Sequence, residues 1–372
     1  MAAAVLLSWN ACQKSGSVPE TAVDESARMP VLFGSNLQSS ISTRSVMESW
    51  TGGENLYIYG LRRVDDKYVL PSGTDPYAEN DPNAYLIRNV VAKSPTSGTH
   101  GEIKVYRNPT TQEYFYYRES PYYYNFYGYY VADAAGANPS PVERTDTIAL
   151  RVAIDGTQDI MLAHTSRRAD AAGTGVDISR VYGAYAARHR VTPDLIFEHE
   201  LSRFDFKLKA GNTMTASDVT VQSLTVSSKT VGSLVIASND TIAIPRGIYP
   251  STTQTPVALT VPGASGALSL DGGEFGSIMV MPGASIYQVE LQVKQTGYTL
   301  NDGIVTQKMD IDFSKIKPSP SSSQSVDSKG ESGHKYDVMI TVYGLEKVQI
   351  EVTMSSWDSQ HGYFEIDPDE NE

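Results

Sequence analysis

Short apolar stretches that alternate with polar residues recur through the second half of the chain at regular spacing. Examples are Val219–Val226, Ser233–Ala237 and Tyr287–Val293. Alternation with a period of two places one face of a strand in a core and the other in water. Several such strands, separated by turn residues, predict a sandwich or barrel rather than a fold of alternating strands and helices. We therefore expect an all-β protein.

The segment Phe204–Leu208 near the middle of the chain alternates apolar and charged side chains and is followed by the turn pair Gly211-Asn212. This pattern predicts the first core strand of a second β-domain, with residues 197–203 as the joint. A chain of 372 residues is long for one sandwich and suits two domains with their own cores. We place an N-terminal β-sandwich at 29–194 and a C-terminal one, ending in an acidic tail, at 195–372.

The beginning of the chain is a short apolar run, residues 1–12, that ends in the single cysteine, Cys12. The run is too short to span a bilayer but suits the apolar part of an export signal. Ala11 directly before Cys12 resembles the lipobox of bacterial lipoproteins, where the cysteine is acylated, although Trp9 departs from the usual Leu. The alternative is a buried strand with an inert thiol. We expect a lipoprotein signal at 1–12, lipidation of Cys12 and a polar tether at 13–28.

The charge and the histidines bear on function. A net charge of −13 argues against nucleic acid as a partner, because phosphate binding needs clustered Lys and Arg. After the N-terminus no run of eighteen apolar residues occurs, so membrane contact is expected only through a lipid anchor. The six histidines show no metal-ligand spacing, and no nucleophile motif occurs. We expect no enzymatic activity, no cofactor and no metal site.

His199, between Glu198 and Glu200, is the residue most easily mistaken for a catalytic group. On a strand, both glutamate side chains point away from the histidine face, so the three groups cannot converge. We expect His199 to be structural.

Nine of the 23 tyrosines lie between Tyr114 and Tyr130. They predict either aromatic packing across neighbouring strands or an exposed tyrosine ladder that binds other surfaces. The second interpretation makes Tyr122, Tyr124 and Tyr127 candidates for an adhesive surface. It leaves open an alternative function, a surface lipoprotein that binds carbohydrate or a host ligand.

Five landmarks occur in a fixed order along the chain: Trp50-Thr-Gly-Gly-Glu54 after Thr43-Arg44, Phe197-Glu-His-Glu-Leu-Ser-Arg203, Met281-Pro-Gly283, the strand Tyr336–Val342, and Ile350-Glu-Val-Thr-Met354 before Trp357. Together they resemble the fimbrillin family (Mfa-like or FimA-like) of pilus subunits from Bacteroides-type bacteria. The resemblance covers about residues 30–360.

This resemblance implies two tandem transthyretin-like β-sandwiches in an exported lipoprotein at the outer membrane or cell surface. It implies a structural, tip or anchor subunit that assembles with other pilus subunits into a fimbria and supports adhesion, with contact to host or bacterial surface ligands. In such proteins a protease that cuts after a basic residue releases the first strand, which a neighbouring subunit replaces. The processing candidates here are Arg44, which is favoured, and Arg28. Cleavage at Arg44 would free the strand spanning Val31–Ile41.

Overall fold

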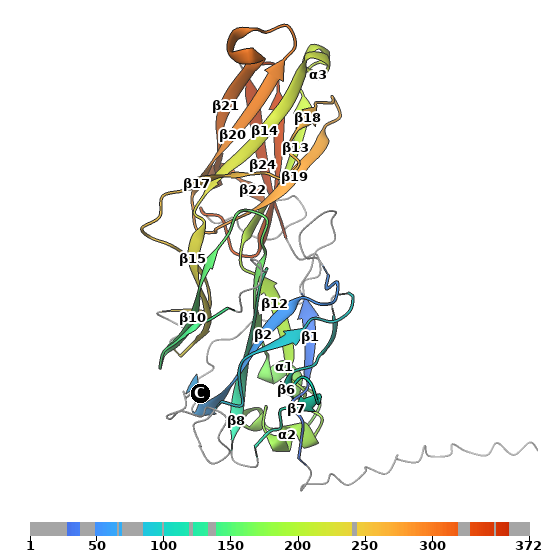
Figure 1. Cartoon of the computed structure of the whole chain (residues 1–372), viewed down its shortest axis with the longest axis vertical. Coiled ribbons are helices and arrows are strands. Elements are labelled where there is room, and N and C mark those ends of the chain that lie inside the picture. The colour runs from blue at the N-terminus through green and yellow to red at the C-terminus, as the bar shows by residue number, and fades with distance from the viewer. Residues whose placement is uncertain are drawn as a thin grey trace, which may run out of the picture.

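The computed structural model describes residues 28–37, 49–64, 67–68, 85–98, 100–118, 122–132, 139–239, 244–318, 328–345 and 347–356. The protein is built mostly of strands, and the prediction of an all-β fold is confirmed. Figure 1 shows two groups of sheets stacked along the long axis, here called the lower half and the upper half.

The lower half consists of an eight-stranded sheet and a four-stranded sheet. The large sheet has the order β3 (Lys67–Tyr68), β2 (Asn55–Val64), β8 (Tyr123–Val131), β11 (Ile160–His164), β12 (Asp194–His199), β1 (Phe33–Leu37) and β5 (His100–Ile103), and β4 (Ile87–Lys93) also pairs with β2. The smaller sheet has the order β16 (Gly247–Pro250), β15 (Val231–Ser238), β10 (Thr147–Ala153) and β9 (Val142–Glu143). A small hairpin of β6 (Tyr106–Asn108) and β7 (Glu113–Tyr114) lies at the lower end of the molecule (Figure 1).

Alternation along β8 explains why the large sheet is buried on both faces. Tyr124 and Phe126 point to one face and join a core cluster together with Phe33. Tyr129 points to the other face and belongs to the core shared with the four-stranded sheet, where it stacks on Tyr57 at 5.0 Å between ring centroids. Aromatic rings that occupy both faces of a strand bury large apolar areas and hold the two layers together.

The first face of the large sheet is covered by an excursion between β11 and β12. It contains α1 (Arg167–Ala171), the 3-10 helix η1 (Ile178–Arg180) and α2 (Ala184–Arg188). Tyr182 and Ala186 of this excursion are buried in the same cluster as Phe126. Although the excursion contains Gly173, Gly175 and Gly183, it forms a covering layer of the core.

The upper half consists of two sheets packed face to face (Figure 1). One has the order β19 (Gly273–Val280), β13 (Ser202–Ala210), β23 (His334–Val342), β24 (Val348–Ser356) and β22 (Lys317–Pro318). The other has the order β17 (Val257–Thr260), β14 (Val219–Ser228), β20 (Ile286–Gln295) and β21 (Ile304–Asp312), and β18 (Gly266–Ala267) also pairs with β14. Short helical turns connect the strands: α3 (Thr213–Asp218), η2 (Leu300–Gly303) and η3 (Phe313–Lys315).

The expected core strand at Phe204–Leu208 is β13, and its apolar face is the centre of the upper core. The ring of Phe204 contacts three rings from outside its own strand, with centroids 5.1 Å from Tyr287, 5.5 Å from Tyr336 and 6.5 Å from Phe313. These edge-on and tilted contacts are the arrangements that aromatic quadrupoles favour.

Strand pairing does not follow the expected boundary between residues 194 and 195. β12 lies in the large lower sheet, where it pairs with β1 and β11. β15 and β16 come later in the chain than β13 but pair with each other and with β10 of the lower half. An alternating pattern specifies which face of a strand is buried but not which strand it joins. The division into two tandem domains stays a prediction.

We predict that Phe204→Ala lowers the free energy of unfolding by about 3–5 kcal/mol, because it leaves a cavity among three aromatic rings. The matched control is Lys207→Ala on the same strand, where the side chain is exposed and the change should stay within about 0.5 kcal/mol. Urea denaturation measures both. Equal losses for the two variants would contradict the central position of Phe204.

Candidate functional site

β1 is an inner strand of the large sheet and is hydrogen-bonded on both sides. It runs parallel to β12, with Gly34 opposite Asp194 and Leu37 opposite Phe197. It runs antiparallel to β5, with Phe33 opposite Ile103. If β1 left the sheet, the facing edges of β12 and β5 would both lose their main-chain partners. We call the space that β1 fills between them the β1 slot.

Side chains of β1 enter the lower core at alternate positions. Val31, Phe33 and Leu37 are buried, and the ring of Phe33 meets Phe126 edge-on at 4.9 Å between centroids. Ser35 points to the same face, and its buried Oγ has no hydrogen-bond partner among the described residues. A buried hydroxyl without a partner costs about 1–3 kcal/mol. The resident strand is therefore an imperfect occupant of the slot.

The residues just before β1 are paired as well. The Val31 N–H donates to the Phe115 carbonyl at 2.8 Å, and the Tyr117 N–H donates to the Met29 carbonyl at 2.9 Å. Arg28 is exposed, and its guanidinium carbon lies 4.8 Å from the centre of the Tyr116 ring. The other processing candidate, Arg44, and the lipidation candidate, Cys12, lie outside the described residues.

The two arginines differ in what cleavage would do. Residues 1–37 are joined to the remainder of the chain only through the segment that contains Arg44. A cut after Arg44 would leave β1 held by hydrogen bonds and packing alone. A cut after Arg28 would leave β1 covalently attached to its own sheet.

The three tyrosines proposed as an adhesive surface do not share one face. Tyr124 is 1% exposed and belongs to the lower core, and Tyr122 is half-buried against that same core. Tyr127 is half-buried on the opposite face of the sheet, below the guanidinium of Arg246 at 5.7 Å. Successive residues of a strand point to opposite faces, so Tyr124 and Tyr127 cannot form one exposed ladder.

His199 is buried where β12 ends, and its Nδ1 lies 2.9 Å from a carboxylate oxygen of Asp159. The carboxylate also accepts a hydrogen bond from the Ile160 N–H at 2.8 Å. Glu198 points away from this pair, as strand alternation predicts, and lies 3.5 Å from His164. The contact between His199 and Asp159 therefore links the end of β12 to the start of β11. Asp159 was not identified as the partner of His199 from the sequence.

Only Glu200 and Leu201 separate β12 of the lower half from β13 of the upper half. The Ser332 hydroxyl, just before β23, donates to the backbone carbonyl of Glu200 at 2.8 Å and to its carboxylate at 3.1 Å. Burial raises the pKa of Glu200 to about 7, although the bond from Ser332 and the positive charge of Arg246 oppose the rise. A single carboxylate thus lies where segments from both halves meet.

Arg203, the last residue of the joint, is fully buried with an exposed fraction of 0%. Its Nε lies 2.6 Å from the Asp205 carboxylate, and Lys335 of β23 approaches the same carboxylate at 3.8 Å. A buried guanidinium is tolerated only with such a partner, because desolvation of an unpaired charge costs several kcal/mol.

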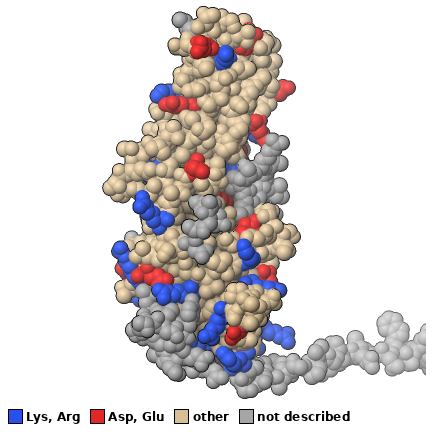
Figure 2. Space-filling view, in the orientation of Figure 1, with Lys and Arg blue, Asp and Glu red and all other residues tan. Residues whose placement is uncertain are grey.

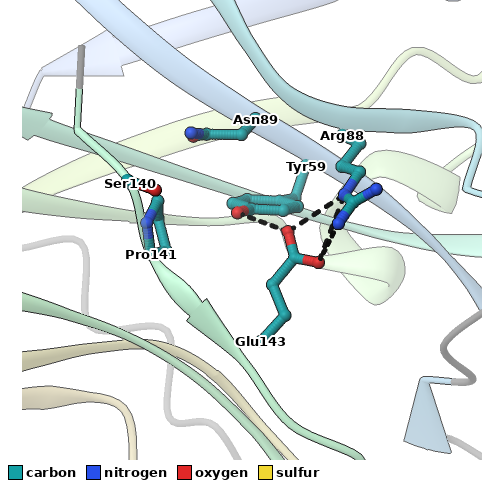
Figure 3. Close-up of a pocket in the computed structure, with 6 residues that line it drawn as sticks. All are labelled: Tyr59, Arg88, Asn89, Ser140, Pro141 and Glu143. Atoms are coloured by element: carbon teal, nitrogen blue, oxygen red, sulfur yellow. Dashed lines mark hydrogen bonds and ion pairs between the residues drawn. The ribbon is translucent and has the colours of Figure 1, made fainter.

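A pocket of about 410 Å³ lies between the sheets of the lower half. Figure 3 shows the residues around it. It is lined by Tyr59, Arg88, Asn89, Ser140, Pro141 and Glu143. The Glu143 carboxylate accepts hydrogen bonds from the hydroxyls of Tyr59 at 3.0 Å and Tyr85 at 2.9 Å, and it pairs with Arg88 at 2.9 Å. Burial and this carboxylate raise the pKa of both tyrosines, so each keeps its proton and donates it. The carboxylate therefore fastens β9 to β2 and β4.

The family model described as fimbrillin-like matches residues 43–357. The chain belongs to the fimbrillin-like family. The resemblance drawn from sequence landmarks is thereby confirmed, and family membership supports a role as a pilus subunit at the cell surface. Fimbrillin-like proteins are structural proteins and not enzymes.

Solved structures similar to this fimbrillin-like protein include a putative cell adhesion protein from Bacteroides uniformis, with 16% identity over 89% of this chain and 98% of that chain and a TM-score of 0.48. A putative cell adhesion protein from Bacteroides ovatus has 18% identity over 90% and 100% of the two chains and a TM-score of 0.47. The fimbrial anchor protein Mfa2 from Porphyromonas gingivalis has 12% identity over 88% and 98% and a TM-score of 0.33. Among curated proteins no match is found.

Two further observations concern the described ranges of the chain. None of their helices is long and apolar enough to cross a membrane. They also hold no group of three or more His, Cys, Asp or Glu side chains that could bind a metal ion.

We predict that the joint is more stable in mild acid. Because folding raises the pKa of Glu200 from 4.5 to about 7, the folded state holds this proton more tightly than the unfolded chain. The contribution is fully present below the unfolded value and is lost as the pH rises through about 7. The component of unfolding free energy due to Glu200 should fall by about 3 kcal/mol across this window.

Urea titrations at about pH 5 and about pH 8 measure this component. Glu200→Gln should remove this pH-dependent component and raise the free energy of unfolding at the higher pH. Glu274→Gln, which removes a carboxylate at an exposed position of β19, is the matched control. If the two variants show the same pH dependence, Glu200 does not control stability at the joint.

Proposed function

We propose that this fimbrillin-like protein is exported as a lipoprotein through Cys12, held at the outer membrane, and assembled into a surface fimbria by strand exchange at the β1 slot. In this proposal residues 1–12 are the lipoprotein signal and residues 13–28 the tether. The assembled fimbria supports adhesion to host or bacterial surfaces. The observation that carries the proposal is the position of β1 between two hydrogen-bonded neighbours, with its only covalent link to the sheet on the Arg44 side.

The geometry of the slot defines what an incoming strand must supply. It needs main-chain groups that pair with β12 on one side and β5 on the other, and apolar side chains at alternate positions. The resident strand places a hydroxyl, Ser35 Oγ, at one inward position where it has no partner among the described residues. An incoming strand with an apolar side chain there would avoid this cost. A donor strand of this kind would compete with β1 once β1 is no longer covalently held.

We predict that limited digestion with an arginine-specific protease converts the wild-type protein into polymers that form ladders on denaturing gels. The new N-terminus of the matured protein should be Ser45, which Edman sequencing or mass spectrometry identifies. Arg44→Ala should abolish the ladder, because β1 then stays covalently attached to its own sheet.

Arg28→Ala is the matched control, since a cut at Arg28 leaves β1 in place, and this variant should still polymerise. Ladders from Arg44→Ala after protease treatment would show that processing occurs elsewhere or is not required.

The lipid anchor is tested separately. Expressed in a Bacteroides-type host, the wild-type chain should incorporate labelled fatty acid and partition with outer membranes. Cys12→Ala should lose the label completely and be recovered in the soluble fraction. Labelling that persists in Cys12→Ala would exclude Cys12 as the acylated residue.

A further inference from the structure

The strand that occupies the β1 slot has its two smallest residues, Gly34 and Ser35, next to each other near its centre. The register of the sheet places Gly34 directly opposite Asp194 of β12 on one side and Glu102 of β5 on the other. Residues opposite each other on neighbouring strands have their side chains on the same face. A side chain at position 34 would therefore lie between two carboxylates, and glycine places none there.

The backbone does not require a glycine at this position. The φ angle of Gly34 lies outside the left-handed region, so other residues can adopt its conformation. A β-carbon on Gly34 would lie 2.9 Å from Oδ1 of Asp194, which is the end of a side chain that can rotate away. Glycine inside a strand also weakens it, because glycine loses more conformational freedom on folding and packs no side chain.

Asp194 is a half-buried carboxylate, and no Lys or Arg of the described ranges forms an ion pair with it. Burial raises the pKa of Asp194, and the imidazoles of His100 and His164 partly oppose the rise. A second carboxylate is near, because the Asp194 N–H donates to Asp170 at 3.1 Å. A cation placed beside Asp194 would offset part of the cost of burying its charge.

Glu102, on the other side of position 34, is exposed. Its carboxylate lies 3.8 Å from Nζ of Lys104, and both side chains are about half exposed. An ion pair of this kind is weak, because water screens it and both side chains lose freedom in forming it. Glu102 can therefore accept a further donor from a strand in the slot.

The next position faces the core. Ser35 is 3% exposed, and its hydroxyl has no partner in the part of the chain that the structure describes. It lies between Phe33 and Leu37 on the same face, and both of these side chains belong to the lower core. The slot is thus matched to apolar side chains on one face and to a cation on the other, and the resident strand supplies neither at its centre.

On the face of the molecule shown in Figure 2, charged side chains form small groups of both signs separated by uncharged surface. A distribution of this kind selects a strand through contacts at single positions and not through a broad field of one sign. The register of the β1 slot is therefore the level at which a donor strand is recognised.

We propose that the preferred occupant of the emptied β1 slot is an extended segment of another pilus subunit that has a Lys or Arg between two apolar residues. The cation takes the place of Gly34, and the apolar residues take the places of Phe33 and Ser35. This assignment of a partner rests on the proposed strand exchange. Cross-strand ion pairs with Asp194 and Glu102 hold the cation, while the apolar side chains fill the core.

Residues 357–372 of this chain contain no Lys or Arg. A second copy is therefore expected to be a weaker donor through this segment, and to fill the slot only where no cationic donor is present.

The first experiment uses the full chain, in which β1 itself reports on the slot. Gly34→Lys should have a ratio of folded to unfolded protein about fivefold higher than Gly34→Gln, whose side chain is neutral. In the background of Asp194→Asn with Glu102→Gln, the two variants should be equally stable. Urea denaturation measures these ratios. Equal stabilities of Gly34→Lys and Gly34→Gln in the otherwise unchanged chain would overturn the proposal.

The second experiment offers separate strands to protein that has been cleaved after Arg44. Fluorescent peptides with the sequence of residues 29–37 compete with β1, and fluorescence anisotropy follows their uptake. The peptide with Gly34→Lys should bind about fivefold more tightly than the peptide with Leu32→Lys, which has the same net charge. Adding Ser35→Val to the Gly34→Lys peptide should strengthen binding further, because it removes the hydroxyl that lacks a partner.

The remaining outcomes are distinct. Equal uptake of the two lysine peptides would mean that attraction to a chain of net charge −13 controls binding, and would overturn the proposal. A peptide of residues 357–372 that binds more tightly than the Gly34→Lys peptide would make a second copy the occupant. If no peptide enters the cleaved protein, strand exchange and the proposed function fail, whereas the comparison of Gly34→Lys with Gly34→Gln still decides whether the slot prefers a cation.

Discussion

Two strands of each half continue almost directly into strands of the other half, and the structure depends on this constraint. β12 becomes β13 across Glu200 and Leu201, and β14 becomes β15 across Lys229 and Thr230. Two such short connections, made by different parts of the chain, leave little freedom for the halves to rotate. A further contact joins the halves: the Met279 N–H of β19 donates to the Gly156 carbonyl, between β10 and β11, at 2.9 Å, and the Met279 side chain is buried in the lower core.

Polar side chains at this joint are buried. Each has a partner that offsets the free-energy cost of removing it from water. Arg203 has Asp205, His199 has Asp159, and Glu200 has Ser332. Replacing such pairs by apolar residues is often neutral for stability, whereas removing one partner is costly. The arrangement therefore favours one geometry of the joint, because a shifted strand register or a rotated half would leave charged side chains without partners. In a rod built of many subunits, a defined angle at each joint would be repeated along the whole length.

Sequence patterns predicted the strands well and their partners poorly. β13, β14, β20 and the β23–β24 hairpin follow from alternation and turn residues. The pairing of β15 with β10 does not, because an alternating strand can join any sheet that offers an apolar face. The helices α1 and α2 contain five residues each, too few for a period of 3.6 to be read from sequence. Asp159 and His199 lie forty residues apart, and only the folded sheet brings them together.

The parallel pairing of β1 with β12 has a mechanical consequence. Both strands run along the long axis of the molecule (Figure 1), with Gly34 opposite Asp194 at one end and Leu37 opposite Phe197 at the other. A pull along that axis loads all the hydrogen bonds of the pair together, in shear, and not one after another as in unzipping. The β1 strand is therefore held most firmly against a pull along the long axis of the molecule.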